Sequence, residues 1–200
     1  MVSELTSLMC ECSIDKWTRY VPKPDPLTFR LTKNNHNTLQ GVRDGTFLQE
    51  KDIQRWQLWV EFNAKKYWAC DGGPISKDRC VDVMVLDDPQ MPNLIPIAKK
   101  LHPDLPIVYR SHIELRSDLI SKHGSSQEQV WDYLWSNIKD ADLLLSHPVK
   151  SFVPKGVDPK MVGLLPASTD WLDGLNKPLP DWDASFCLNS LRSVRNGVEV

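Results

Sequence analysis

The chain has 200 residues, of which 41% are hydrophobic, with a formal net charge of -2 and a pI near 6.2. This composition supports one globular domain with a hydrophobic core, and the balanced charge leaves no basic face for nucleic acid or anionic lipid. No apolar run approaches the roughly 20 residues of a membrane-spanning helix, and the polar N-terminus lacks the basic start of a signal peptide, so we expect a cytoplasmic protein without membrane or nucleic-acid partners.

The five cysteines show no metal or disulfide pattern. Cys10 and Cys12 are too close for a CxxC motif, the other three are isolated, and the odd number argues against a paired disulfide framework. Reduced thiols are therefore expected. The histidines also lack the short, regular spacing of a zinc site, so we expect neither a metal nor a cofactor.

The first predicted helix is polar and ends at a glycine. The segment TFRLTKNNHNTLQG, residues 28–41, mixes a few apolar side chains with a polar cluster and stops at Gly41. On such a helix Lys33 and Asn37 lie four residues apart and His36 neighbours both, so the three can share one face. This face either points at a ligand or is an ordinary solvated surface.

A longer helix and a series of strand-helix units follow. Apolar residues from Leu48 to Trp68 recur with a period near 3.6, which predicts one helix facing the core, with its tryptophans interpreted as packing residues. Short apolar runs then alternate with amphipathic segments, which predicts βαβ units and a parallel sheet. The fold class is therefore α/β, a Rossmann-like parallel sheet with helices on both faces. The predicted strands are residues 82–86, 106–110, 142–146 and 161–166, and the predicted helices are 94–101 and 126–141.

Each predicted strand ends in polar residues. In an open parallel sheet, ligands bind outside the carboxyl ends of the strands, where the strand-to-helix loops converge. Four such loops on one edge would form a cleft suited to a hydroxylated or phosphorylated ligand. The loops are Asp87–Gln90, Arg110–Arg116, Ser146–Pro148 and Ala167–Asp170.

The basic residues of this edge have two interpretations each. His112 either donates to a sugar hydroxyl and transfers protons, or is simply hydrogen-bonded at a strand end. Arg110 and Arg116 either hold a phosphate or form ordinary ion pairs. Asp118 and Glu114 are the acidic partners near in sequence, and we assign a ligand role to only one of the two arginines.

The aspartate pair after the first predicted strand is also ambiguous. Asp87 or Asp88 either orients a ligand hydroxyl or forms an Asx turn or a helix N-cap before Met91. Two adjacent carboxylates do not flank a scissile bond from two sides, which argues against a glycosidase pair. The sequence also contains no GxGxxG, P-loop or GxSxG motif, so it gives no grounds for a dehydrogenase, a nucleoside triphosphatase or a serine hydrolase.

Five ordered segments resemble a known enzyme family. In chain order, TFRLTKNNHNTLQG, VLDDPQMPNLIP, VYRSHIELRSDL, LLLSHPVKSFVP and VGLLPASTDWLDGLNKPL resemble the N-terminal half of the trehalose phosphorylase and trehalose synthase group of retaining glycosyltransferases. The resemblance implies a GT-B fold, of which residues 15–190 are the incomplete, acceptor-side N-terminal domain. Residues 1–14 are then expected to be a poorly ordered N-terminus and residues 191–200 a divergent tail.

The resemblance implies transfer of glucose between trehalose and phosphate, or synthesis of trehalose from a nucleotide-activated glucose and glucose. Expected ligands are therefore glucose, trehalose, and phosphate or a nucleotide sugar, and the full-length enzyme is a candidate homo-oligomer. The implied chemistry retains configuration without a side-chain nucleophile, because the donor's own phosphate helps deprotonate the incoming hydroxyl. The donor-binding half is not among these 200 residues, so we expect the chain to be inactive alone. The alternative is a non-catalytic sugar-binding or interaction module derived from the enzyme.

Matching the motifs residue by residue assigns roles in this chain. His112 of YRSHIEL matches the family's cleft histidine and is the expected catalytic residue. The DPQ loop and the polar helix supply acceptor-side residues. The expected substrate-binding residues are Lys33, His36, Asn37, Asp88, Gln90, Arg110, Arg116, Ser168 and Asp170.

Overall fold

The computed structural model describes residues 22–42, 47–78 and 81–166, and, nearer the C-terminus, residues 180–182, 185–186 and 188. The chain divides into two compact units, residues 1–166 and 167–200. The first unit holds a parallel sheet and the helices packed against it. The domain boundaries predicted at residues 14 and 190 lie outside the described residues and stay a prediction.

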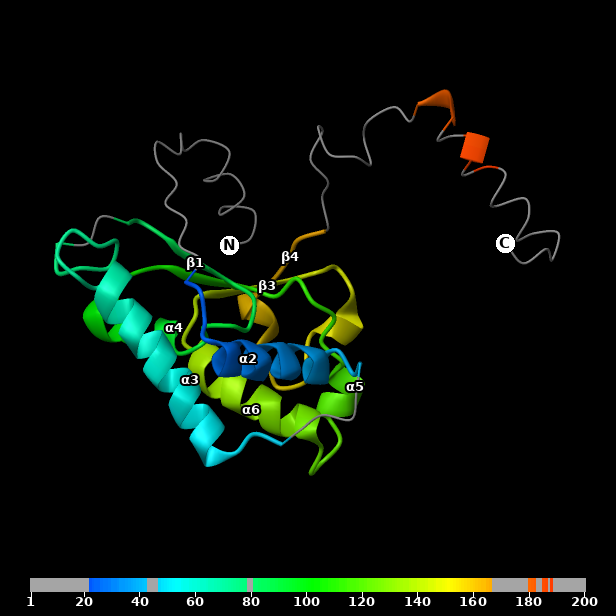
Figure 1. The fold of residues 1–200 in the computed structure, drawn as a ribbon, viewed down its shortest axis with the longest axis horizontal. Coiled ribbons are helices and arrows are strands. Elements are labelled where there is room, and N and C mark those ends of the chain that lie inside the picture. Colours follow the sequence, from blue (N-terminus) through cyan, green and yellow to red (C-terminus); the bar gives the residue numbers. More distant parts are fainter. Residues whose placement is uncertain are drawn as a thin grey trace. The chain divides into compact units, whose positions relative to one another are not determined.

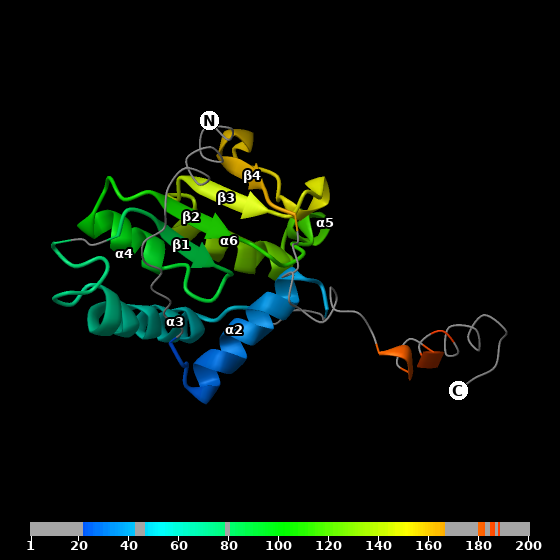
Figure 2. The ribbon, with the colours of Figure 1, turned by 90° about the horizontal axis from the view of Figure 1, so that it is seen from above.

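Four parallel strands form one sheet, and their order in space follows their order in the chain (Figure 1, Figure 2). The register sets Asp87 beside Arg110 and Ser146 beside Leu164, so the carboxyl ends of the strands meet at one edge of the sheet. The α/β, Rossmann-like prediction is confirmed, and each predicted strand overlaps an observed one. The strands are β1 (Met84–Asp87), β2 (Ile107–Arg110), β3 (Leu143–Ser146) and β4 (Val162–Leu164).

The helices also follow the predicted pattern. The long predicted helix is α3, which runs on into the π-helical turn η1. None of the described helices is both long and apolar enough to cross a membrane. The helices are α2 (Pro26–Leu39), α3 (Glu50–Asn63), η1 (Ala64–Trp68), α4 (Leu94–Leu101), α5 (Ser117–Ile120) and α6 (Ser126–Ile138), with short 3-10 turns η2 (Lys150–Phe152) and η3 (Pro159–Met161).

Local chemistry fixes both ends of α2. The Asp25 carboxylate accepts hydrogen bonds from the backbone N–H groups of Leu27 (3.0 Å) and Thr28 (3.2 Å), which caps the first turn. The helix ends as predicted at Gly41, whose φ of 67° is unfavourable for residues with a Cβ atom. A Cβ atom there would also lie 2.8 Å from the Leu119 Cδ1 atom. Gly41 therefore both stops α2 and lets it approach α5.

The two faces of the sheet differ in how well they are covered. Figure 1 shows the labelled helices on one side of the sheet. Strand side chains facing them are buried, whereas those facing away are half-buried or exposed. The sequence predicts helices on both faces, and the described residues supply them on one. The buried set includes Leu86, Ile107, Tyr109 and Leu144, and the opposite set includes Val85, Val108, Leu143 and Leu145.

Two neighbouring leucines of β3 allow a test of the difference in packing between the two faces of the sheet. We expect Leu144→Ala to lower the free energy of unfolding by about 2–5 kcal/mol, because it leaves a cavity in the core between sheet and helices. Leu145→Ala removes the same atoms from the half-buried opposite face and is expected to cost clearly less. Urea unfolding of the two variants measures the difference. Equal losses would mean that both faces of the sheet are packed to the same extent.

Candidate functional site

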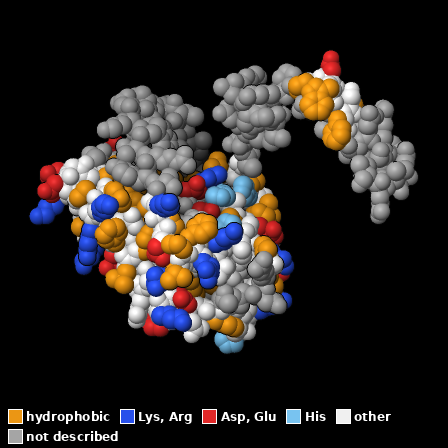
Figure 3. Space-filling model, viewed as in Figure 1, with side chains coloured by type: hydrophobic (Ala, Val, Ile, Leu, Met, Phe, Trp, Pro, Cys, Tyr) orange, Lys and Arg blue, Asp and Glu red, His pale blue; other side chains and the backbone are white. Residues whose placement is uncertain are grey.

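Ionisable side chains from three segments meet where β1 and β2 end. Asp87 closes β1 and Asp88 follows it, Arg110 closes β2, and His112 lies two residues further on. His36 comes from the last turn of α2. We call these five residues the rim cluster. Figure 3 shows histidine side chains together with acidic and basic ones at one place on the surface.

Asp88 is the buried centre of the cluster. The residue is 5% exposed, and its carboxylate Oδ2 lies 3.3 Å from His112 Nε2, 3.6 Å from His36 Nε2 and 3.5 Å from Gln90 Nε2. Its φ is 67°, in the left-handed region that aspartate and asparagine enter more readily than most residues. The backbone N–H of Asp88 donates to the Arg110 carbonyl at 2.8 Å, which extends the parallel pairing into the turn. The turn therefore points a carboxylate inward, between two histidines.

This carboxylate carries an electrostatic cost. Burial raises the pKa of Asp88, since the charged form loses hydration, while the neighbouring charges of His112 and His36 partly offset that rise. The Oδ1 atom is also buried, and no residue in the described part of the chain forms a hydrogen bond with it. A charged group held this way destabilises the fold, so its position favours a functional role over a purely structural one.

His112 lies between the two aspartates. Its Nδ1 atom is 3.4 Å from Asp87 Oδ1, and its Nε2 atom is 3.3 Å from Asp88 Oδ2. Both ring nitrogens can donate to these carboxylates only when the ring is protonated. The contacts are long for hydrogen bonds, and the His112 side chain is 43% exposed, so one nitrogen can exchange a carboxylate for an incoming hydroxyl.

Arg110 is paired within the rim. Its Nη1 atom donates to both oxygens of Asp87, at 3.0 and 3.2 Å, across the register pair that joins β1 and β2. This partner differs from Asp118 and Glu114, the acids near it in sequence. Both side chains are partly exposed, so the pair is weak and a bound anion can compete for the guanidinium.

Arg116 forms the ordinary ion pair. Its Nε and Nη2 atoms donate to the two oxygens of Asp118, at 2.9 and 2.8 Å. These hydrogen bonds lower the pKa of Asp118 to about 2. The backbone N–H of Arg116 donates to the Leu39 carbonyl, which ties the segment to the end of α2. Of the two arginines, Arg110 is therefore the one inside the rim cluster.

The remaining predicted residues divide into three groups. Gln90 lies at the rim, where its amide contacts Asp88. On α2, His36 joins the cluster, whereas Lys33 is exposed, Asn37 is half-buried, and neither side chain contacts the cluster within the described residues. Ser168 and Asp170 lie outside the described residues.

Two further residues support the rim, Ser111 lies beside it, and none of the three was predicted as a site residue from the sequence. The Trp56 indole N–H donates to the Gln90 carbonyl at 2.7 Å, so this buried core residue also holds the loop after β1. His147 Nε2 lies 3.0 Å from the His112 carbonyl oxygen. Ser111 is 2% exposed, and within residues 22–42, 47–78 and 81–166 its Oγ atom has no partner. Sequence position marked His147 and Ser111 as strand-end residues, but no local pattern signals the Trp56 hydrogen bond.

Comparison with known proteins identifies the family. Residues 1–154 match the family model described as "Trehalose synthase, N-terminal domain". The chain belongs to this family. The match confirms the resemblance found in the five ordered segments.

Relatives of this chain include two trehalose phosphorylases. The one from Grifola frondosa is 50% identical over 176 residues, which are 88% of this chain and 24% of that protein. The one from Pleurotus pulmonarius is 53% identical over 175 residues, 87% of this chain and 23% of that protein. A trehalose synthase from Rubrobacter xylanophilus is 26% identical over 172 residues, 86% of this chain and 36% of that protein. The chain thus spans about a quarter of the length of the two phosphorylases.

Two tryptophans of α3 allow a test of whether the Trp56 hydrogen bond stabilises the loop after β1. We expect Trp56→Phe to lower the free energy of unfolding by about 1–3 kcal/mol, because the Gln90 carbonyl loses its buried donor. Trp59→Phe on the same helix is the control, since no hydrogen bond from its indole occurs within the described residues. Urea unfolding compares the two. A loss no larger than that of the control would mean that the indole hydrogen bond contributes nothing.

The pKa of Asp88 predicts a pH-dependent stability. Because the folded-state pKa lies above the ordinary value of 3.8, the folded state binds more protons than the unfolded state in the window above pH 3.8. The stability that Asp88 contributes is therefore at its maximum below pH 3.8 and is lost as the pH rises through the raised pKa of the folded state. Asparagine tolerates the same backbone conformation. We therefore expect the free energy of unfolding of Asp88→Asn, relative to that of the wild type, to increase as the pH rises. Urea unfolding from pH 3.5 upward checks this, and a difference that stays constant or shrinks would contradict it.

Proposed function

We propose that this chain is the acceptor-side part of a retaining glycosyltransferase of trehalose metabolism with GT-B architecture. The reaction would transfer glucose between trehalose and phosphate, or from a nucleotide-activated donor to glucose. Support comes from the family membership of residues 1–154 and from relatives named trehalose phosphorylase and trehalose synthase. The donor-binding half and any homo-oligomeric assembly belong to the complete enzyme.

The observation that carries the proposal is the placement of His36, Asp88 and His112 together at the carboxyl ends of the strands. This edge is where parallel α/β sheets bind their ligands. Sugar hydroxyls both donate and accept hydrogen bonds, so a cluster of imidazole donors and carboxylate acceptors suits them. The resemblance of the motifs around His36, Asp88 and His112 to the family and the geometry of these residues both support this proposal.

His112 is the residue we propose to contact the sugar at the reacting end. It is partly exposed, and its contacts to Asp87 and Asp88 are long enough for a hydroxyl to replace one of them. Asp88 is nearly buried, so we propose that it acts through His112 and His36 by fixing both rings. Arg110 adds positive charge at the same edge, where it can stabilise an oxyanion or a phosphate.

A chimaera tests this function. The 175 matching residues of the Pleurotus pulmonarius trehalose phosphorylase would be replaced by those of this chain, and phosphate-dependent release of glucose 1-phosphate from trehalose would be measured. Trehalose formation from a nucleotide sugar and glucose is measured in parallel. The comparison shows whether phosphate or a nucleotide is the donor's leaving group. A folded chimaera that performs neither reaction would contradict the proposal.

In the active chimaera we expect His112→Ala to lower kcat by about 100-fold or more, with little change in melting temperature. The side chain is partly exposed at the edge of the sheet, so its removal leaves the core intact. His123→Ala is the matched control, because His123 is fully exposed and pairs only with Glu128 in the described structure. A loss of kcat accompanied by an equal loss of stability would make His112 a structural residue.

A non-catalytic role is the alternative for the chain alone. Calorimetric titration of the 200-residue chain with glucose and with trehalose tests for binding without turnover. Saturable binding together with an inactive chimaera would favour a sugar-binding module. Binding together with an active chimaera supports the proposed enzyme.

A further inference from the structure

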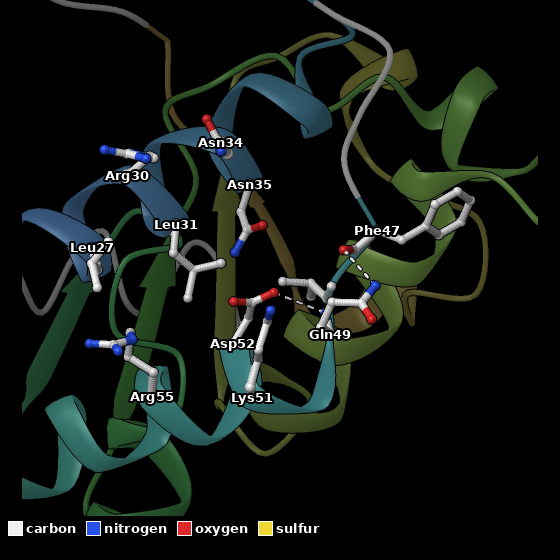
Figure 4. A pocket seen from close by; sticks show the side chains of 11 residues that line it. Leu27, Arg30, Leu31, Asn34, Asn35, Phe47, Gln49, Lys51, Asp52 and Arg55 are labelled. Atoms are coloured by element: carbon white, nitrogen blue, oxygen red, sulfur yellow. Dashed lines mark hydrogen bonds between the residues drawn. The ribbon is translucent and has the colours of Figure 1, made fainter.

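A cavity lies between α2 and the start of α3, and no residue of the rim cluster lines it. Its volume is about 690 Å³, within the range of small-molecule pockets. Figure 4 shows side chains from the two helices pointing into this space from opposite sides. Nothing in the proposed glucose transfer uses these residues.

Cations outnumber acids among the residues that line the cavity. Arg30 of α2 and Lys51 and Arg55 of α3 line it, against one carboxylate, Asp52. One Asp52 oxygen already accepts from the Gln49 backbone N–H at 3.1 Å. Three cations that face one carboxylate favour an anionic ligand.

The cations are also largely uncommitted. Arg55 lies 3.7 Å from Asp25, and both side chains are about half exposed, so this pair is weak. Arg30 and Lys51 make no ion pair within the described part of the chain. Their charges are therefore available to a ligand.

Asn35 is the second, independent sign of a ligand. The residue is 2% exposed, yet its amide nitrogen Nδ2 has no hydrogen-bond partner among the described residues. A buried donor without an acceptor is unfavourable. Asn35 lines the cavity, and Figure 4 shows its side chain pointing from α2 into it, while Lys51 points in from α3. An acceptor oxygen between the two would satisfy the amide and pair with the ammonium group.

The site depends on side chains and not on the helix N-terminus. The Leu48 backbone N–H donates to Gln129 Oε1 at 2.8 Å, and the Gln129 amide donates back to the Leu48 carbonyl at 3.1 Å. The Gln49 N–H is likewise taken by Asp52. Backbone donors that precede α3 are thus already used, and the anchoring by α6 fixes this wall of the cavity.

Apolar residues complete the walls. Leu27 and Leu31 line the cavity from α2, and Phe47 and Leu48 line it from the segment before α3. The cavity is larger than a phosphate ion needs, so it has room for an organic group against these side chains. The combination of uncommitted cations, a buried amide donor and apolar walls matches a phosphate group attached to a small carbon skeleton.

We propose that this cavity binds a small organic phosphate, a phosphate monoester, with Asn35 Nδ2 and Lys51 donating to the phosphoryl oxygens, while Arg30 and Arg55 add positive charge to the lining. The site goes beyond the proposed glucose transfer and does not depend on it. Binding weakens with added salt, because the attraction is partly electrostatic.

Titration of the 200-residue chain with glucose 6-phosphate, followed by NMR, tests the proposal. We expect saturable shifts of the Asn35 side-chain amide, and weaker binding of inorganic phosphate, which lacks a carbon skeleton. Lys51→Ala should weaken glucose 6-phosphate binding by about tenfold, since it removes a charge-assisted contact. Lys100→Ala, at an exposed position on α4, is the matched control and should leave affinity unchanged.

Asn35→Ala separates binding from folding. Because it removes an unpaired buried amide, we expect binding to fall while the melting temperature stays the same or rises. His112→Ala should leave binding intact, which distinguishes this cavity from the rim even if the proposed glucose transfer fails. The proposal is overturned if binding does not saturate, if Asn35→Ala and Lys51→Ala bind as well as the wild type, or if His112→Ala abolishes binding.

Discussion

The parallel pairing of β1 with β2 is the constraint on which the candidate site depends. It sets Asp87 beside Arg110, and the hydrogen bond from the Asp88 N–H to the Arg110 carbonyl carries the pairing one residue further. The chain then turns with a positive φ, and this turn directs the Asp88 carboxylate inward. The same pairing brings the segment that carries His112 alongside. Without this register, the two aspartates and the histidine would not share one edge.

This arrangement is energetically unfavourable for Asp88. Burial raises the pKa of its carboxyl group, its Oδ1 atom has no partner in the described structure, and its backbone is in an uncommon conformation. Trp56 helps to hold the turn, since its indole donates to the Gln90 carbonyl from the core side. Stability contributed by a buried tryptophan thus offsets strain in the loop beside it. Such local instability held by a packed core is typical of binding and catalytic sites.

Helix α2 contributes residues to both the rim cluster and the cavity beside α3, because adjacent residues lie on different faces of a helix. His36 reaches the rim, whereas Asn35 lines the cavity beside α3. The Asp25 cap and the Gly41 terminus fix where the helix begins and ends, and thereby which residue points to which side. A small change in the rotation of α2 would alter both sites at once.

Local patterns in the sequence determined the elements of this protein. Alternating apolar runs and amphipathic segments predicted the four strands and the main helices, Gly41 marked the end of α2, and strand-end positions placed Asp87, Asp88 and Arg110 at one edge of the sheet. These features depend on neighbours along the chain, so they can be recognised without the fold.

Tertiary packing decided which side chains meet. His36 contacts Asp88 although the two are far apart in the chain, Arg110 pairs with Asp87 instead of the acids nearest in sequence, and Lys33 stays in solvent despite sharing the polar helix. The roles of Trp56 and Asn35 likewise appear only once helices lie against one another and the sheet. The partner of a buried group depends on the register of strands and the rotation of helices, and these are set by the core as a whole.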